Sequence, residues 1–206
     1  MDEDRRRAKE AVRAMGRKEK IKYYLGYYKF HILVVAVLAI LLALFIRDRM
    51  TYKKPVFFFG IMNSDRIDEQ YLVEEANEIL KLGEKETTMV HKNMYSSPGM
   101  ESEFQDYLTV YLAADELNIL FTDETGVKYM ADSDACVPVE NWGVGETLAN
   151  REDVVFSYEG KNVAIDFSDT ELFRELKLEE DIHYLLVVNK PGREEQVAAF
   201  LKAVLQ

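Results

Sequence analysis

Residues 20–46 read KIKYYLGYYKFHILVVAVLAILLALFI, and this stretch decides where the rest of the chain can fold. From Ile32 to Ile46 all fifteen residues are apolar, and Phe30 extends the run to seventeen with His31 as the one interruption. A helix of that length covers roughly 25 Å, against a hydrocarbon core of about 30 Å. Tyrosine rings settle at headgroup level and lysines snorkel beside them, so an aromatic flank lengthens the span. That flank consists of Tyr23, Tyr24, Tyr27 and Tyr28, with Lys22 and Lys29.

Two other interpretations explain less of this stretch. The core helix of a soluble domain accounts for the apolar run but not for the tyrosine belt. A cleaved signal peptide also joins a basic start to an apolar run. Here about thirty residues precede the run, no Ala-x-Ala site follows it, and Arg47-Asp48-Arg49 stands at its exit. No cysteine follows to accept a lipid, so the pattern favours a retained signal anchor.

The charges on either side of the run predict its orientation, because Lys and Arg resist translocation. Residues 1–29 contain ten of them and residues 47–54 contain four. We therefore expect a type II single-pass protein of the cell membrane, with a cytoplasmic amino terminus and an extracellular carboxyl-terminal domain. Its expected parts are a basic cytoplasmic arm (1–22), a transmembrane helix (23–46), a linker (47–55) and an extracytoplasmic domain (56–206).

Charge differs sharply between the two parts of the chain. Residues 55–206 carry 12 basic and 31 acidic residues, a net charge of −19, whereas the whole chain carries −11. A negative field of this size repels nucleic acid, so DNA or RNA binding is not expected. The excess serves either solubility or a surface for cations or basic partners. The basic arm is expected to contact the anionic inner leaflet, at about 1 kcal/mol for each basic side chain.

The external domain has the pattern of alternating strands and helices. Strands are predicted at 57–62, 87–94, 117–121, 154–158, 163–167 and 184–188. Helices are predicted after the capping groups Asn63-Ser64-Asp65, Ser97-Pro98, Thr122-Asp123-Glu124, Ser168-Asp169-Thr170-Glu171 and Pro191-Gly192. About six strands and five helices form one compact α/β domain with a mainly parallel mixed sheet, long enough to bury a core.

A resemblance to a known family rests on three segments. Residues 117–123, then Tyr129-Met130-Ala131 and Val137-Pro138-Val139, resemble the strand, short helix and proline-marked loop in one lobe of extracytoplasmic solute-binding proteins. Residues 184–189, Pro191 and 194–205 are similar to the strand and helix with which such proteins close. The plan as a whole resembles uncharacterised single-pass membrane proteins of Gram-positive bacteria. The likeness implies a single lobe, which cannot close on a ligand as two lobes do.

The ends of the predicted parallel strands supply the candidate ligand-binding residues. In open α/β sheets, ligands bind beyond the carboxyl ends of the strands, where helix amino termini also point. The residues expected there are Asn63, Ser64, Asp65, Tyr95, Ser96, Thr122 and Asp123, followed by Ser97 and Glu124, with Trp142 as an aromatic wall. The alternative is that Ser64, Asp65 and Ser97 only cap helices and that Trp142 only packs.

The sequence contains no catalytic or metal-binding constellation. His91 and His183 fall in or beside predicted strands, with no serine or cysteine in a nucleophile elbow. Asp132-Ser133-Asp134 begins like a calcium loop but lacks the central glycine and the later glutamate. Cys136 is the single cysteine, so no internal disulfide forms, and we expect it to be a small buried apolar residue. No cofactor is expected.

These observations lead to three functional hypotheses in order of preference. The first is a membrane-anchored extracytoplasmic binding or interaction module, an accessory subunit of a membrane complex with a membrane-protein partner. The second is a single-lobe sensor of a small solute at the strand carboxyl ends. The third is a membrane-anchored hydrolase that uses Asp65 or Asp123.

Overall fold

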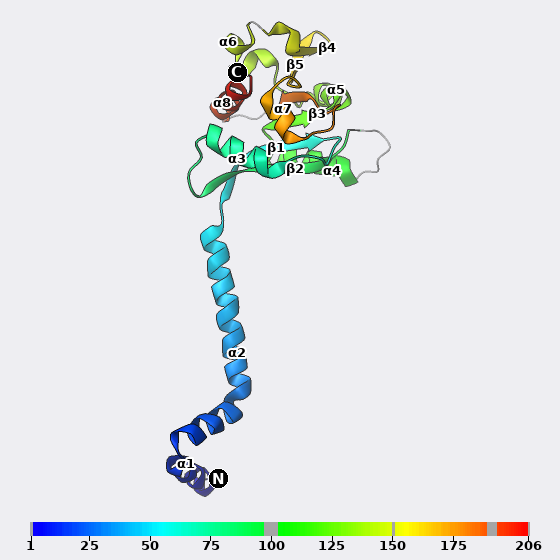
Figure 1. Cartoon of the computed structure of the whole chain (residues 1–206). Helices are drawn as coiled ribbons and strands as arrows, with labels where there is room; N and C mark the ends of the chain where they lie inside the picture. The colour runs from blue at the N-terminus through cyan, green and yellow to red at the C-terminus, as the bar shows by residue number, and fades with distance from the viewer. Residues whose placement is uncertain (1, 97–102, 150, 189–192, 206) are drawn as a thin grey trace. The chain divides into compact units, whose positions relative to one another are not determined.

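The computed structural model describes residues 2–96, 103–149, 151–188 and 193–205. It divides into two compact units, Met1–Tyr52 and Lys53–Gln206 (Figure 1). The predicted helix starts at Ser97-Pro98 and Pro191-Gly192 lie outside the described residues.

The amino-terminal unit contains two helices, α1 (Asp2–Ala14) and α2 (Arg17–Thr51). The Gly16 N–H donates to the Glu19 carboxylate over 3.1 Å at the start of α2. Among the described helices, α2 is the one that is long and apolar enough to cross a membrane, and none of its side chains is buried. It is longer than the predicted span of 23–46 because the basic residues before Tyr23 and the polar residues after Ile46 continue the same helix.

The external unit is built on one open sheet of six strands in the order β2-β1-β3-β6-β5-β4. The strands are β1 (Lys54–Met62), β2 (Glu86–Met94), β3 (Ile119–Thr122), β4 (Val155–Tyr158), β5 (Lys161–Asp166) and β6 (Tyr184–Val187). Two residues, Tyr52 and Lys53, separate α2 from β1. The predicted linker of 47–55 is therefore mostly helix and strand.

The α/β class and the mixed sheet are confirmed, but the expectation of a mainly parallel sheet is wrong. β1 pairs in parallel with β2 and β3, whereas the β3–β6, β6–β5 and β5–β4 pairs are antiparallel. The two-residue turn Glu159-Gly160 explains why β4 and β5 pair in antiparallel fashion. Both residues have positive φ angles, 49° and 78°, and so tight a turn can join only antiparallel strands.

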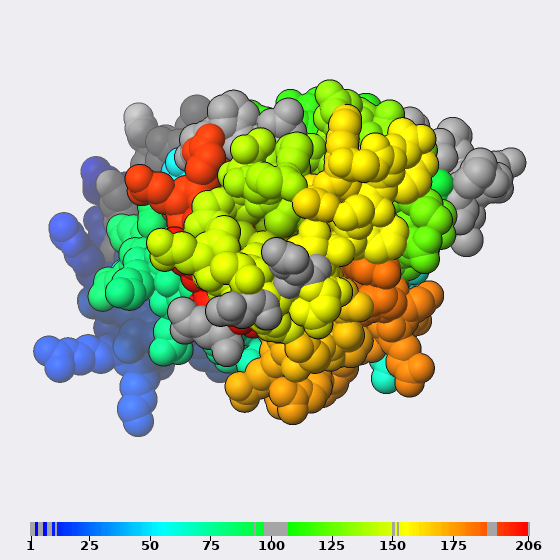
Figure 2. All heavy atoms as spheres, turned by 90° about the horizontal axis from the view of Figure 1, so that it is seen from above, coloured from blue at the N-terminus to red at the C-terminus, as the bar shows by residue number. Residues whose placement is uncertain are grey.

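This unit has six described α-helices, one more than the five predicted, and the additional helix is the short α6. They are α3 (Glu69–Ile79), α4 (Glu103–Ala113), α5 (Glu124–Asp132), α6 (Gly145–Leu148), α7 (Glu171–Leu176) and α8 (Glu194–Val204), with 3-10 turns η1 (Val139–Asn141) and η2 (Glu152–Val154). Figure 2 looks onto the segments from α6 to α7, which lie against one another.

Two predicted helix limits differ from the structure. α3 begins at Glu69, where the Asp68 carboxylate accepts from the Tyr71 N–H over 3.2 Å. Asn63-Ser64-Asp65 therefore does not cap it. α7 ends at Leu176 rather than at Leu178, because Lys177 adopts a left-handed conformation with φ 54°. The predicted capping box Ser168-Asp169-Thr170-Glu171 does lead into α7, but the N-cap is Thr170 rather than Ser168, since the Thr170 hydroxyl accepts from the Phe173 N–H over 3.2 Å.

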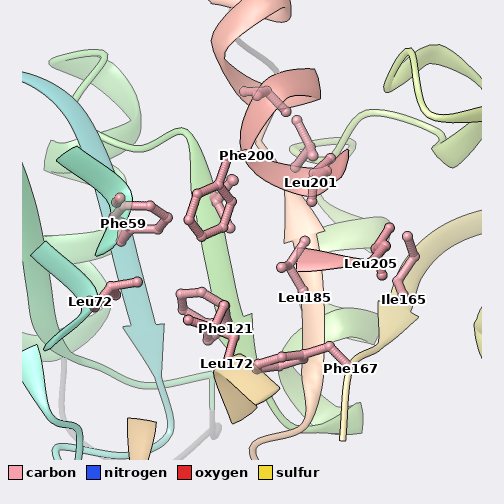
Figure 3. Close-up of a cluster of buried hydrophobic side chains, with 14 of the residues drawn as sticks. Phe59, Leu72, Phe121, Ile165, Phe167, Leu172, Leu185, Phe200, Leu201 and Leu205 are labelled. Atoms are coloured by element: carbon pink, nitrogen blue, oxygen red, sulfur yellow. The ribbon is translucent and has the colours of Figure 1, made fainter. Parts of the chain in front are cut away.

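The sheet is buried on both faces, which explains the apolar runs in its strands. On one face Phe57, Phe59 and Ile61 of β1 join side chains of α3, α7 and α8 in the larger core cluster. Phe59 lies 4.9 Å from Phe200 and 5.9 Å from Phe121 between ring centroids (Figure 3). On the other face Met62 joins side chains of α4 and α5 in a second cluster.

Candidate functional site at the strand ends

The carboxyl ends of β1, β2 and β3 lie at one edge of the sheet, as their parallel pairing requires. Asn63 follows β1 directly and adopts a left-handed backbone conformation, with φ 65°. Asparagine tolerates this region better than most residues because its side chain bonds locally. The Asn63 N–H donates to the Met94 carbonyl over 2.7 Å, so the chain turns while still attached to the end of β2.

The Asn63 side chain ties all three strand ends together. Its amide nitrogen donates to Ser96 Oγ over 2.8 Å and to Asp123 Oδ1 over 2.6 Å. Its amide oxygen accepts from the Ser96 N–H over 2.8 Å. We call Asn63, Ser96, Thr122 and Asp123 the strand-end latch. Sequence reasoning placed these four residues together, and the structure brings them into one hydrogen-bonded group.

Asp123 is the acceptor at the centre of the strand-end latch. Besides Asn63, its Oδ1 accepts from the Gly126 N–H over 2.8 Å at the start of α5 and from the Thr122 hydroxyl over 3.4 Å. Thr122 and Ser96 are buried. Buried polar groups must find partners inside the protein. The latch residues find them in one another, and the resulting network holds the strand ends.

Three other predicted site residues, Ser64, Asp65 and Tyr95, follow the same strands. Ser64 is buried, and its hydroxyl accepts from the Arg66 N–H over 3.1 Å, a local turn contact. Asp65 is exposed and Tyr95 is half-buried. Of the eight predicted site residues, the four of the latch are the ones whose bonds to one another are described above.

Trp142 lies away from the latch, so its prediction as an aromatic wall is wrong. Its indole N–H donates to the Val137 carbonyl over 2.8 Å, and the Val137 N–H donates to the Val187 carbonyl over 2.9 Å. Val187 pairs with Ile119 at the amino end of β3, whereas the latch lies at the carboxyl end. The Trp142 side chain is 3% exposed and belongs to the larger core cluster.

A second polar group, His91, was not recognised as unusual from the sequence. Its ring lies between Phe58, 5.8 Å away, and Tyr111, 3.9 Å away, and is nearly parallel to both. Among the described residues the buried Nε2 has no hydrogen-bond partner, and a carboxylate oxygen of Glu116 lies 3.7 Å away. Burial lowers the pKa of His91, opposed by the negative charge of Glu116. Burial therefore favours the neutral imidazole.

Beside His91 the domain exposes three large apolar side chains. Met89 is 41% exposed on β2, and Tyr107 and Val110 are 48% and 57% exposed on α4. Met89 is two residues from His91 on the same face of the strand, and the Tyr107 ring lies 6.5 Å from Tyr111, which covers His91. We call Met89, Tyr107 and Val110 the α4–β2 patch.

The other reactive side chains do not assemble a catalytic group in the described part of the chain. Cys136 is half-buried, and burial raises the pKa of its thiol, so the nucleophilic thiolate is disfavoured. His183 Nε2 lies 3.9 Å from Asp166 and its Nδ1 is 2.9 Å from the Glu180 carbonyl. Among the residues that the structure describes, no group of three His, Cys, Asp or Glu side chains is placed to hold a metal ion.

Comparison of the chain with models of protein families, with curated proteins and with solved structures finds no match.

Proposed function

We propose that this protein is a membrane-anchored interaction module. In this proposal α2 crosses the cell membrane, the basic arm lies on the anionic inner leaflet and the α/β domain faces outward. There it acts as an accessory subunit of a membrane complex. Three features of the chain support the proposal: the apolar helix α2, the charge asymmetry and the α4–β2 patch.

The first two features are the apolar helix and the charge asymmetry. α2 exposes its whole apolar surface, and in water that surface costs roughly 25 cal/mol for each Å². A bilayer removes this cost. The concentration of Lys and Arg before the apolar run supports the cytoplasmic location of the amino terminus.

The exposure of the α4–β2 patch is the main observation that supports the proposed interaction role. Among the described residues of the external domain, Met89, Tyr107 and Val110 are the large apolar side chains that are exposed. A partner surface with an apolar centre would cover Met89, Tyr107 and Val110. Because residues 55–206 carry a net charge of −19, basic residues around that centre would steer the partner onto the domain.

Site-specific photo-crosslinking in intact cells tests this role. A photoreactive residue at Val110 is expected to capture one membrane protein. The same residue at Ser168, an exposed position after the fifth strand of the sheet, is expected to capture none. Met89→Lys should abolish the capture at Val110, because it places a cation within the apolar centre and repels a basic rim.

The proposal fails if Val110 and Ser168 give the same products, or if Met89→Lys leaves the Val110 product unchanged. The unfolding transition of each variant, followed by the fluorescence of Trp142, distinguishes loss of contact from loss of folding. Trp142 is the single tryptophan of the chain and lies in the core, so it reports on the domain alone.

The solute-sensor and hydrolase hypotheses lack a comparable observation among the described residues. The Asp123 carboxylate is engaged by three donors of the protein itself. Asp65 is exposed, and no hydrogen bond or ion pair with another described residue orients it for catalysis. The likeness to one lobe of solute-binding proteins remains a prediction from the sequence.

A further inference from the structure

A hollow of about 220 Å³ lies where α3, α7 and α8 meet. The side chains that line it include Tyr71, Glu75, Ile79, Glu171, Leu172 and Val204. Tyr71, Glu75 and Ile79 recur at four-residue spacing and so share one face of α3. Figure 3 labels Leu172 among the buried side chains of the core.

The walls of the hollow are tied together by polar contacts. The Asp68 N–H at the start of α3 donates to the Leu176 carbonyl at the end of α7 over 2.8 Å. Lys177 donates to the Asp68 carboxylate over 2.6 Å. The ion pair lowers the pKa of Asp68, first through the hydrogen bond from Lys177. These contacts fix α7 against α3.

Two carboxylates, those of Glu75 and Glu171, line the hollow. The pKa of Tyr71 is raised, first by burial and then by the negative charges of Glu75, Glu175 and Glu171. Within the described ranges, no Lys, Arg or His lies at ion-pair distance from any of these three carboxylates.

Apolar side chains line the same hollow, namely Ile79, Leu172 and Val204. This mixture decides what kind of cation fits. A metal ion needs several oxygen ligands at about 2.0–2.6 Å. The described acidic side chains form no such group here. An organic cation on an alkyl stem matches this mixed lining, since the carboxylates pair with its charged head and the aliphatic side chains cover its stem.

Tyr71 and the size of the hollow further restrict the class of ligand that can bind. A phenol face attracts an ammonium or guanidinium group within about 6 Å of the ring centre. Pockets for drug-sized ligands enclose about 300–1,000 Å³. A hollow of about 220 Å³ instead suits a group no larger than one long side chain.

We propose that this hollow binds an alkylammonium or guanidinium group. The group comes either from a free amine or from a Lys or Arg side chain of a protein. The site belongs to the folded domain and does not depend on the α4–β2 patch or on the orientation of the chain. Its failure would therefore leave the proposed membrane role untouched, and the reverse also holds.

Calorimetric titration of the full-length protein in detergent tests the proposal. The probes are 1,4-diaminobutane, a short peptide with one central lysine, and 1-butanol as a neutral control. Saturable binding of the diamine assigns the site to free amines. Binding of the peptide alone assigns it to a protein side chain. The control alcohol should give no saturable heat.

Matched variants locate the binding. The double variant Glu75→Gln, Glu171→Gln should weaken binding at least tenfold, because it removes both lining charges while preserving size. Glu84→Gln removes a charge from an exposed turn outside the hollow and should leave the affinity unchanged. Absence of binding by both cationic probes overturns the proposal. So does an equal loss in the Glu84→Gln control, or an unchanged affinity in the double variant whose unfolding transition is intact.

Discussion

Two phenylalanines, one in each unit, show that the same type of side chain has different roles in the two units. Phe45 in α2 is 65% exposed, and Phe59 in β1 is 0% exposed. The domain covers Phe59 with its own α3, α8 and neighbouring strands. Within the described chain nothing covers Phe45. The difference shows that the apolar residues of the domain stabilise its fold, whereas those of α2 require a surrounding that the protein does not supply.

The largest expected effect comes from truncating each phenylalanine. Phe59→Ala should lower the free energy of unfolding of the domain by about 3–5 kcal/mol, because it leaves a cavity among Phe57, Phe121 and Phe200. Phe45→Ala removes the same atoms and should leave that free energy unchanged. Urea unfolding in detergent, followed by Trp142 fluorescence, measures both. Equal losses would show that α2 belongs to the same cooperative unit as the domain.

The strand-end latch gives the next effect. Asn63→Ala should cost about 2–3 kcal/mol, of which the lost hydrogen bonds account for about 1–2 and the left-handed backbone for about 1. Asn63→Gly loses the bonds but tolerates φ 65°, so it should cost about 1 kcal/mol less. The same unfolding experiment compares the two variants. If both cost under about 0.5 kcal/mol, the latch does not hold the strand ends.

A pair of glycines extends the comparison to backbone packing. A methyl group at Gly126 would collide with the Thr122 side chain and come within 2.9 Å of Met62 Sδ, whereas at Gly26 it meets nothing within 4 Å. Gly126→Ala should therefore cost about 1–2 kcal/mol, since crowding outweighs the gain in helix propensity. Gly26→Ala should leave domain stability unchanged. A neutral or stabilising Gly126→Ala would contradict the close packing of α5 on the sheet.

A comparison of His91 in the domain with His31 in α2 gives the smallest expected effect, which depends on pH. The folded domain lowers the pKa of His91 by burial, so the unfolded chain takes up a proton first. Stability should fall as pH drops below the ordinary value of 6.5 and level off below the folded pKa. His91→Phe should reduce this dependence, and His31→Phe in α2 should not. Urea midpoints from pH 8 to pH 5 test the prediction, and identical profiles for all three proteins would refute it.

Sequence reasoning succeeded where a property belongs to neighbouring residues. The apolar run after Phe30 predicts α2 without reference to the rest of the chain. The run at 57–62 predicts a buried strand for the same reason. The residues of the latch could also be predicted, because the carboxyl ends of parallel strands must meet at one edge of the sheet, which brings Asn63, Ser96 and Asp123 together.

The failures concern contacts between distant segments. The antiparallel direction of β6 depends on how the chain returns from α7, which no local pattern records. Trp142 was assigned to the wrong edge because its partner, Val137, is placed by pairing with β6. Asn63 and Asp68 are both good helix caps by residue type. The latch engages Asn63, and Asp68 starts the helix.

The location of the domain relative to the membrane tests the central claim most directly. In a Cys136→Ser background, Ser168→Cys places one thiol on the exposed surface of the domain and Ala14→Cys places one on the amino-terminal arm. A membrane-impermeant maleimide added to intact cells should label Ser168→Cys fully and Ala14→Cys only after lysis. Labelling of Ala14→Cys in intact cells with protection of Ser168→Cys, or recovery of the domain free in the medium, would contradict the account.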